Sequence, residues 1–468
     1  MKIESQKITD FSNGLICQGA VSNSLMPSNV ATESTNLDFD RIGCATLRKG
    51  QTRVGNQITA SANILGLYEF RDSGAGTNNQ IISVLGTAVY YLSGATWTSL
   101  RTVTTGCKAE FVTYLDYTFM VNGTDATMSW NGDPASGFGL VNSTSAPIGI
   151  DTEVFRNRLW IINATDRIYY SSLPNEITGL ITWDTANNWI DISPQDGDNC
   201  IGLKRSKNAL LIFKRNHIYR VYSTTETEPD PKISVGTYSG RSIVEASDGI
   251  YFHHPTGIYR YVDGAITCLS QPIVDFINNI TVANHSKVAG WCDGDHVLFS
   301  VGDVTIGDVN YNNVVLRYTI SSKVWTVRTY PTQILCASDY NDGTTIYRLV
   351  GDDNGNVLAV DDGTSDNGTS IFYSLVIGPK TLDGSFSTEK LISKMAVIHE
   401  NAQGTTISVK ADSDNDNKYK AIYSISDDIA KQFTTNVRGN KIWFRASGAT
   451  LGNQFTLGGY ELIDIYAE

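Results

Sequence analysis

The stretch Asn208-Ala-Leu-Leu-Ile-Phe-Lys-Arg-Asn-His-Ile-Tyr-Arg-Val-Tyr222 decides the fold of this chain. Its apolar run, Leu210 to Phe213, is typical of a buried strand. The Tyr-rich second run alternates apolar and polar residues, as a strand with one solvated face does. The four polar residues between the two runs, Lys214 to His217, suit a tight turn. The stretch therefore predicts a β-hairpin.

The same pattern recurs along most of the chain, at intervals of 37 to 52 residues. A period near 40–50 residues with about four short strands per unit is the signature of a β-propeller. The units predict a ring of about seven blades, with six or eight left open because the units are irregular. The centres of the apolar runs are Ile82, Phe119, Trp160, Ile212, Phe252, Leu298 and Tyr347.

Ring closure follows from the way such units bury apolar surface. A single four-stranded sheet cannot bury both faces alone, whereas sheets packed radially bury them against their neighbours. Closing the ring also removes the exposed ends of the array. We therefore expect a strand near the N-terminus, either 36–41 or its partner at 45–54, to complete the last blade.

Composition supports an all-β class. Among 468 residues, 41 are Gly and 23 are Tyr, and aromatic, β-branched and turn-forming residues favour short strands joined by tight turns. A helical apolar stripe is brief even in the best candidate, Pro272 to Ile280.

The chain is predicted to have three parts. Residues 1–35 lack a compact pattern and are expected to form an extended N-terminal arm. Residues 36–365 are expected to form the propeller. Residues 366–468 show longer alternating strands, which suit a separate antiparallel β-sandwich. The Gly- and Asp-rich run at 361–370 marks the boundary.

Charge and segment hydropathy exclude several classes of protein. A net charge of −12 with a pI near 5.0 argues against a duplex-DNA reader, which needs a basic stripe for phosphates. No apolar run is long enough to span a membrane, and the first residues lack the apolar core of a signal peptide. The seven cysteines form no C-x-x-C pair and are expected to be reduced thiols in apolar strands.

Two short motifs raise the question of metal binding. His253-His254 precedes Pro255-Thr-Gly and lacks a third ligand nearby, so we expect a blade loop with one histidine packed and one exposed. The run Asp412-Ser-Asp-Asn-Asp resembles the start of a calcium loop, but Asn417 and Tyr423 stand where Gly and an acidic residue are needed. A solvated hairpin turn is the favoured interpretation, with calcium at 412–416 left open.

Enzyme signatures are missing from the sequence. It has no Gly-x-Ser-x-Gly elbow, no phosphate-cradling Gly-rich loop, no sialidase-type Asp box, and no carboxylate pair that stands out from the turns. We therefore predict a protein that is not an enzyme, with no catalytic, cofactor-binding or metal-binding residues and no cofactor.

The opening of the chain resembles the β-propeller tail-nozzle or hub proteins of short-tailed bacteriophages, also called packaged-DNA stabilisation or tail tubular protein B-like proteins. Those chains begin with Phe-x-x-Gly and a polar arm, followed by an Asn-hydrophobic-Asp-hydrophobic strand, a Gly turn and an Arg-Lys/Pro-Gly element. The matching residues here are Phe11-Ser-Asn-Gly14, Met26-Pro27, Asn36-Leu-Asp-Phe-Asp40, Gly43 and Leu47-Arg-Lys-Gly50, with later phrases at Val154 to Ile161, His217 to Val221 and Gly240 to Ile243.

The resemblance implies a structural virion protein, assembled in the host cytoplasm and located in the phage tail. Members form a homo-oligomeric ring, usually a hexamer, below the portal and adaptor (head–tail connector) rings and next to tail fibre or needle proteins. The ring retains the packaged genome and lets it pass on ejection, without sequence-specific DNA binding. An acidic lumen agrees with this, because it repels phosphates.

The ring would need large subunit interfaces, and the N-terminal arm and C-terminal sandwich are the expected candidates. Basic residues would lie at subunit contacts or on a solvated face; these are Arg48, Lys49, Lys204, Arg205, Lys214 and Arg215.

Other functions stay open. The main alternative is a receptor- or glycan-binding tail protein, in which exposed loop aromatics stack on sugars; the candidates are Trp97, Trp130, Trp183 and Trp189. A propeller hydrolase is disfavoured by the missing Asp boxes. A cytosolic signalling scaffold is disfavoured because its blades would be more regular.

Overall fold

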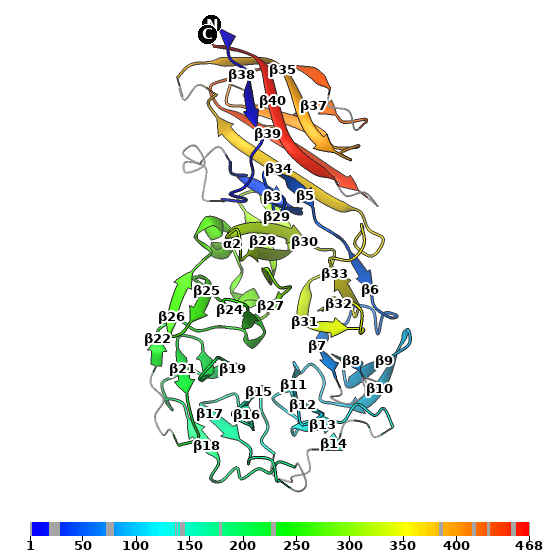
Figure 1. Ribbon diagram of the computed structural model, residues 1–468, viewed down its shortest axis with the longest axis vertical. Coiled ribbons are helices and arrows are strands. Elements are labelled where there is room, and N and C mark those ends of the chain that lie inside the picture. Colours follow the sequence, from blue (N-terminus) through cyan, green and yellow to red (C-terminus); the bar gives the residue numbers. More distant parts are fainter. Residues whose placement is uncertain are drawn as a thin grey trace.

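The computed structural model describes residues 2–17, 29–71, 79–135, 137, 139–140, 146–176, 180–225, 231–382, 387–413, 418–427, 431–450 and 455–467. Figure 1 shows an elongated molecule with a ring of small sheets at one end and larger sheets at the other. Both chain ends lie at the tip that is farthest from the ring (Figure 1).

The ring contains seven four-stranded antiparallel sheets. The strands of the first four sheets are β7 (Ile64–Phe70), β8 (Gln80–Leu85), β9 (Ala88–Ser93) and β10 (Thr96–Thr102); β11 (Glu110–Tyr114), β12 (Tyr117–Val121), β13 (Met128–Trp130) and β14 (Gly139–Leu140); β15 (Asp151–Phe155), β16 (Arg158–Ile162), β17 (Arg167–Tyr170) and β18 (Trp189–Asp191); β19 (Cys200–Arg205), β20 (Leu210–Lys214), β21 (Ile218–Val221) and β22 (Pro231–Ile233).

The strands of the last three sheets are β23 (Val244–Ala246), β24 (Gly249–His254), β25 (Gly257–Val262) and β26 (Ala265–Cys268); β27 (Ala289–Cys292), β28 (His296–Ile306), β29 (Val309–Thr319) and β30 (Val324–Thr329); β31 (Ile334–Asn341), β32 (Ile346–Asp352), β33 (Val357–Val360) and β6 (Gln51–Arg53). In the first six sheets the lowest-numbered strand lies innermost. In the seventh sheet β31 lies innermost and β6 outermost. These radially packed sheets make a β-propeller-like, all-β fold.

The hairpin predicted from the repeated phrase is confirmed. Strands β20 and β21 pair antiparallel, with Leu210 opposite Val221 and Phe213 opposite Ile218. All five residues of β20 are buried, whereas β21 keeps Arg220 partly exposed. The continuous apolar run is therefore the strand that packs against both neighbouring sheets, as its composition predicted.

Neighbouring sheets are held together by shared hydrophobic clusters. Ile212 and Tyr219 of the fourth sheet pack with Trp160 of the third, and each further pair of neighbours has a cluster of its own. The series returns to its start, because Ile64 of the first sheet and Leu349 of the seventh belong to one cluster. The apolar faces of the sheets are thus buried around the whole ring.

Strand β6 closes the ring, which confirms one of the two predicted closing strands. Gln51 to Arg53 pair with Leu358 to Val360 of β33, and the N–H of Val54 donates to the carbonyl of Val357 at 2.8 Å. The other candidate, 36–41, does not enter the ring. Its residues join a larger sheet, where Leu37 pairs with Leu47.

Two larger antiparallel sheets form the other end of the molecule and share one core that includes Leu375, Phe444, Met395 and Leu462. The seven-stranded sheet contains β1 (Lys2–Ile3), β2 (Gln6–Ile8), β4 (Leu37–Asp38), β5 (Ala45–Leu47), β35 (Lys390–Glu400), β38 (Gln432–Gly439) and β40 (Thr456–Ala467). The five-stranded sheet contains β3 (Glu33–Thr35), β34 (Ile371–Lys380), β36 (Thr406–Ala411), β37 (Lys420–Ser424) and β39 (Ile442–Thr450).

The N-terminal residues divide differently from the predicted arm (1–35) and propeller (36–365). Strands β1 and β2 pair with β40, β3 pairs with β34, and β5 pairs with both β4 and β40. The N-terminal strands β1 to β5 are each only two or three residues long, too short to produce a periodic pattern. Further along the chain, β33 ends at Val360 and β34 begins at Ile371.

Helices are few and short in the described residues. They are η1 (Gly240–Ser242), η2 (Gln271–Ile273), α2 (Val274–Asn278) and α3 (Val282–His285). The brief helical pattern at 272–280 corresponds to η2 and α2. No helix among the described residues has the length and apolar character needed to cross a membrane.

Candidate functional site

The residues that carry the N-terminal motif meet where the ring joins the larger sheets. We call this region the joint; it comprises residues 36–40 and 47–50 with their partners on β29, β30 and the 361–366 linker. Asn36 has a φ of 60°, a conformation that Asn adopts more readily than most residues. Its side chain accepts from Arg48 at 2.8 Å and from the N–H of Thr329 at 2.7 Å, and it donates to the carbonyl of Phe372 at 2.6 Å.

Arg48 lies at the centre of the joint. Its guanidinium donates two parallel hydrogen bonds to Asp366, at 2.8 and 2.6 Å, and a third to the carbonyl of Thr329 at 2.7 Å. It also lies over the ring of Tyr330, 4.2 Å from the ring centroid. The Arg48 side chain is 0% exposed and that of Asp366 only 4%, so the pair is shielded from water.

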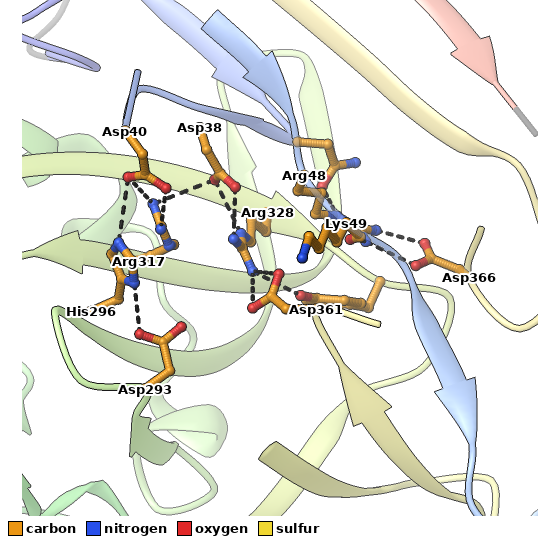
Figure 2. Close-up of polar contacts among 12 residues, drawn as sticks. Asp38, Asp40, Arg48, Lys49, Asp293, His296, Arg317, Arg328, Asp361 and Asp366 are labelled. Carbon is orange, nitrogen blue, oxygen red and sulfur yellow. Dashed lines mark hydrogen bonds and ion pairs between the residues drawn. The ribbon is translucent and has the colours of Figure 1, made fainter. Parts of the chain in front are cut away.

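Two more arginines bind the acidic residues of the motif (Figure 2). Arg328 of β30 donates to Asp38 at 2.7 Å and to Asp361 at 2.9 Å. Arg317 of β29 donates to Asp40 at 2.6 and 3.0 Å. The two Asp residues that alternate with apolar residues in the motif are therefore the ones that hold the segment on the ring.

The pKa values of Asp38 and Asp40 lie below the usual range, so both carboxylates stay ionised at neutral pH. Burial alone would raise the pKa of Asp38, but Arg328 and Arg317 outweigh it and hold that pKa below its usual value. His296 lies between Asp293, at 2.6 Å, and Asp40, at 3.4 Å. Although burial opposes it, hydrogen bonding to these two carboxylates raises the pKa of His296 to about 9, so this histidine is a cation at neutral pH.

The joint is suited to holding the larger sheets on the ring. Its three arginines, Arg48, Arg317 and Arg328, are almost completely buried and are each paired with a carboxylate. Two-pronged Arg–carboxylate bonds also fix the relative orientation of the groups they connect, because both partners are planar. The joint therefore keeps the larger sheets in one orientation on the ring.

A second candidate site is a cavity of about 380 Å³ on the axis of the ring. Its lining includes Glu110, Asp151 and Glu153 from the second and third sheets, with Lys204 and Arg241. The guanidinium of Arg241 pairs with Glu110 at 2.7 Å and donates to the carbonyls of Leu65, Ala109 and Leu335. Arg241 thus connects the first, second and seventh sheets and fills the axis at this level.

Asp151 is the most perturbed carboxyl group of the cavity. Burial, followed by the neighbouring charge of Glu110, raises its pKa well above the usual range. Its oxygens accept from the N–H groups of Leu203, at 2.6 Å, and Thr152, at 2.8 Å. Sequence reasoning missed Glu110 and Asp151 because they are 41 residues apart and resemble any strand-initial acidic residue; only the radial arrangement places both at the axis.

The two motifs considered for metal binding lie in a strand and in a turn. His253 is buried and His254 partly exposed, at the end of β24 rather than in a loop. Asp412 accepts from the N–H groups of Asn440, at 2.8 Å, and Lys441, at 3.0 Å, as a turn residue does. The rest of the calcium-like run, 414–417, lies outside the described residues, as does Met26-Pro27 of the N-terminal motif.

The tryptophans proposed for sugar stacking are not exposed platforms, so that expectation is wrong. Trp97, Trp130 and Trp183 are 9%, 1% and 6% exposed and belong to the clusters between sheets. Trp189 is half-buried, and the guanidinium of Arg167 covers its ring at 3.7 Å. Trp97, Trp130 and Trp189 were misassigned to loops because the strands that contain them are only three to seven residues long. Trp183 lies outside the strands but is still buried.

The expectation for the basic residues fails for two of them. Arg48 is buried in the joint, and Lys214 is buried beside Asp166 and Asp196, each at 2.9 Å. Lys204 lines the axial cavity. Lys49, Arg205 and Arg215 are exposed. All seven cysteines are free thiols, of which Cys200 and Cys336 are buried.

Comparisons with known proteins add little. No protein-family model matches the chain, and no curated protein matches it. Solved structures with similar folds include BamB from Moraxella catarrhalis (10% identity, 70% of this chain and 96% of that one, TM-score 0.41). They also include YCF48 bound to D1 peptide (11% identity, 66% of this chain and 94% of that one, TM-score 0.40). A third is the computationally designed Ika8 protein (10% identity, 75% of this chain and 99% of that one, TM-score 0.41). Scores this low carry no inference about function.

Proposed function

We propose that this chain is a structural virion protein of a short-tailed phage. In this proposal the seven four-stranded sheets are the blades of a propeller, and the two larger sheets form a β-sandwich on its rim. Several copies, six in the simplest case, form a nozzle ring at the distal end of the DNA channel. The ring retains the packaged genome and lets it pass on ejection.

One observation carries the proposal. The residues through which the chain resembles the tail-nozzle proteins are the residues that form the joint. Asn36, Asp38 and Asp40 bind strands β29 and β30 of the ring, while Arg48 binds the linker at Asp366. Phe11 is completely buried in the core of the larger sheets. A motif with such a position serves to fix two units rigidly, as a tail component under mechanical force requires.

The axial cavity indicates where DNA would travel. Its volume of about 380 Å³ is far too small for a duplex, and Arg241 occupies the axis. The passage for DNA would therefore lie between copies of the chain, not through a single propeller. A net charge of −12 favours such a role, because an acidic lumen repels phosphates and keeps the genome from adhering.

The larger sheets offer surfaces for contacts between copies and with neighbouring tail components. Strands β37 and β38 are edges of the five- and seven-stranded sheets and lack a second neighbour among the described strands. An open edge is a natural place for another chain to pair. The adaptor ring and the fibre or needle proteins are the partners that the proposal implies.

Mass photometry of the purified protein, with negative-stain imaging of the same sample, tests the proposal. We expect a species of about six times the 51.2 kDa of one chain, seen as a ring with a central hole. A species that stays monomeric over the full concentration range and binds a glycan array would instead identify a receptor-binding protein. The buried positions of Trp97, Trp130 and Trp183 make that outcome the unexpected one.

A further inference from the structure

Three of the six histidines in the chain gather at one place between the fifth and sixth sheets of the ring. His253 and His254 end β24, and His285 ends α3. The rings of His253 and His285 are stacked, with centroids 5.3 Å apart and an interplanar angle of 22°. Tyr238 contacts the two outer members, His254 at 5.8 Å and His285 at 6.3 Å between centroids. We call these residues the histidine cluster.

His253 is buried without any polar partner for its ring. It is 0% exposed, and among the described residues neither of its ring nitrogens has a hydrogen-bond partner. His285 is 7% exposed, and its Nδ1 also has no partner there. Only the backbone of His253 is satisfied, since its carbonyl accepts from the hydroxyl of Thr237 at 2.8 Å. The stack therefore holds only while both imidazoles are neutral.

The charged groups around the cluster are cations. The groups that act on the ionisation of His253 are His285 and His254, and no carboxylate of the described residues is among them. The segments that pack around it also carry Arg215, whose guanidinium lies 5.6 Å from the ring centroid of Tyr238. Arg241 of η1 and Lys287, just after α3, are the other cations. A proton placed on His253 would thus meet the repulsion of His285 and His254 without a carboxylate partner among the described residues.

Helix α3 carries the chain toward the centre of the ring. The residue after it, Ser286, accepts a hydrogen bond through its carbonyl from Nζ of Lys108 at 2.8 Å. Lys108 precedes β11 of the second sheet, whereas Ser286 precedes β27 of the sixth, so the bond joins sheets that are not neighbours. It lies beside Ala109, whose carbonyl binds Arg241. The segment 282–288 therefore lies next to the axial cavity, whose lining includes Ala109 and Ala289.

We propose that the histidine cluster is an acid-sensitive contact: protonation of His253 and His285 breaks their stack, releases α3, and breaks the hydrogen bond between Lys108 and Ser286 beside the axial cavity. The inference is independent of the proposed role in a phage tail. It assigns to residues 282–288 a second, open position that is favoured in acid.

The direction of the pH effect follows from linkage. Burial first, and then the neighbouring histidines, lower the pKa of His253 to about 3, and burial lowers that of His285. Once α3 is released, both rings return to an ordinary pKa near 6.5. The closed position is therefore fully favoured above about pH 6.5 and loses stability as the pH falls from there toward 3. Each histidine that is protonated only when open changes the open fraction about tenfold per pH unit.

Hydrogen–deuterium exchange of the full chain, followed by mass spectrometry, tests this. After correction for intrinsic exchange, the protection of residues 282–288 should fall at least tenfold per pH unit between pH 6 and 4.5. The variant His253→Phe keeps an aromatic ring in the stack but cannot take a proton. Because the variant has one titrating histidine fewer, the factor by which its protection falls per pH unit should be about ten times smaller than in the wild type. The control His217→Phe, at a histidine outside the cluster, should match the wild type.

Two results would overturn the proposal: protection of 282–288 that is the same at pH 4.5 and pH 7, or a His253→Phe variant that loses protection as steeply as the wild type. If His253→Phe does not fold, exchange at the imidazole C2 position of the wild type decides instead. We expect His253 to titrate well below pH 5, coupled to the loss of protection. Titration of His253 near pH 6.5 without any change at 282–288 would exclude the contact.

Discussion

Arg48 and Asp366 face each other across the joint through two parallel hydrogen bonds, at 2.8 and 2.6 Å, although 318 residues separate them in the sequence. The pair connects the N-terminal motif to the linker between ring and larger sheets. Because both side chains are shielded from water, removal of either partner would leave a buried, unpaired charge and destabilise the fold.

We expect Arg48→Met to lower the free energy of unfolding by about 3–5 kcal/mol, because the change leaves Asp366 as a buried, unpaired charge. Urea unfolding followed by circular dichroism measures this. The control is Arg41→Met, which breaks an exposed pair with Glu400 and should cost less than about 1 kcal/mol. Equal losses in the two variants would show that the buried pair has no special role.

Gly355→Ala should destabilise the closed ring. Gly355 has a φ of +74°, and an added Cβ would lie 1.9 Å from the carbonyl oxygen of Thr59, a backbone atom that cannot move aside. We expect the free energy of unfolding to fall by well over the roughly 1–2 kcal/mol that a positive φ alone costs a residue with a side chain. Gly343→Ala is the matched control: its φ is +94°, but its Cβ would meet nothing within 4 Å. Comparable unfolding free energies for both variants would contradict the clash.

His296 should make the joint sensitive to alkali. Its pKa is raised in the folded protein to about 9, so its stabilising charge is fully present below about pH 6.5 and is lost as the pH rises through 9. Solvent reaches part of the ring, so we expect a loss of only about 1 kcal/mol between pH 7 and 10. The melting temperature measured over this range should fall more in the wild type than in His296→Gln. Parallel curves would remove His296 from the network.

Asp151 should act in the opposite sense to an ordinary paired carboxylate. Its raised pKa means that the folded chain keeps a proton that the unfolded chain releases above about pH 4. Stability is therefore lost as the pH rises from about 4 into the neutral range. Asp151→Asn can still accept from Leu203 and removes this loss, so its stability relative to the wild type should grow from pH 5 to pH 8. A constant difference across that range would rule out the buried proton.

Much of the ring was predictable from the sequence, because each sheet repeats one local pattern. The hairpin at 208–222 and the radial stacking follow from apolar periodicity and from the need to bury both faces of a sheet, and the closing strand was one of the two candidates, 36–41 and 45–54. The larger sheets beyond residue 366 were visible for the same reason, since their strands of eight or more residues alternate clearly.

The joint and the cavity were not predictable, because long-range pairing leaves no local pattern. Asp38 and Asp40 resembled the solvated face of a strand, and their partners Arg328 and Arg317 lie 290 and 277 residues further along the chain. Trp183 resembled a loop aromatic but fills the cluster between the second and third sheets. Glu110 and Asp151 came together only through the curvature of the ring.

The pairing of β1 with β40, where Lys2 lies opposite Tyr466, has a consequence for biosynthesis. A ribosome makes the early strands several hundred residues before their partners, so neither β1 nor β6 can dock while most of the chain is still being translated. The ring closes only when β33 has been synthesised and pairs with β6, which was made much earlier. The larger sheets are completed only when their longest strand, β40, has been synthesised. Closure of the ring and completion of the larger sheets are therefore late steps, with open sheet edges exposed in the meantime, and the nascent chain is vulnerable to aggregation during that interval.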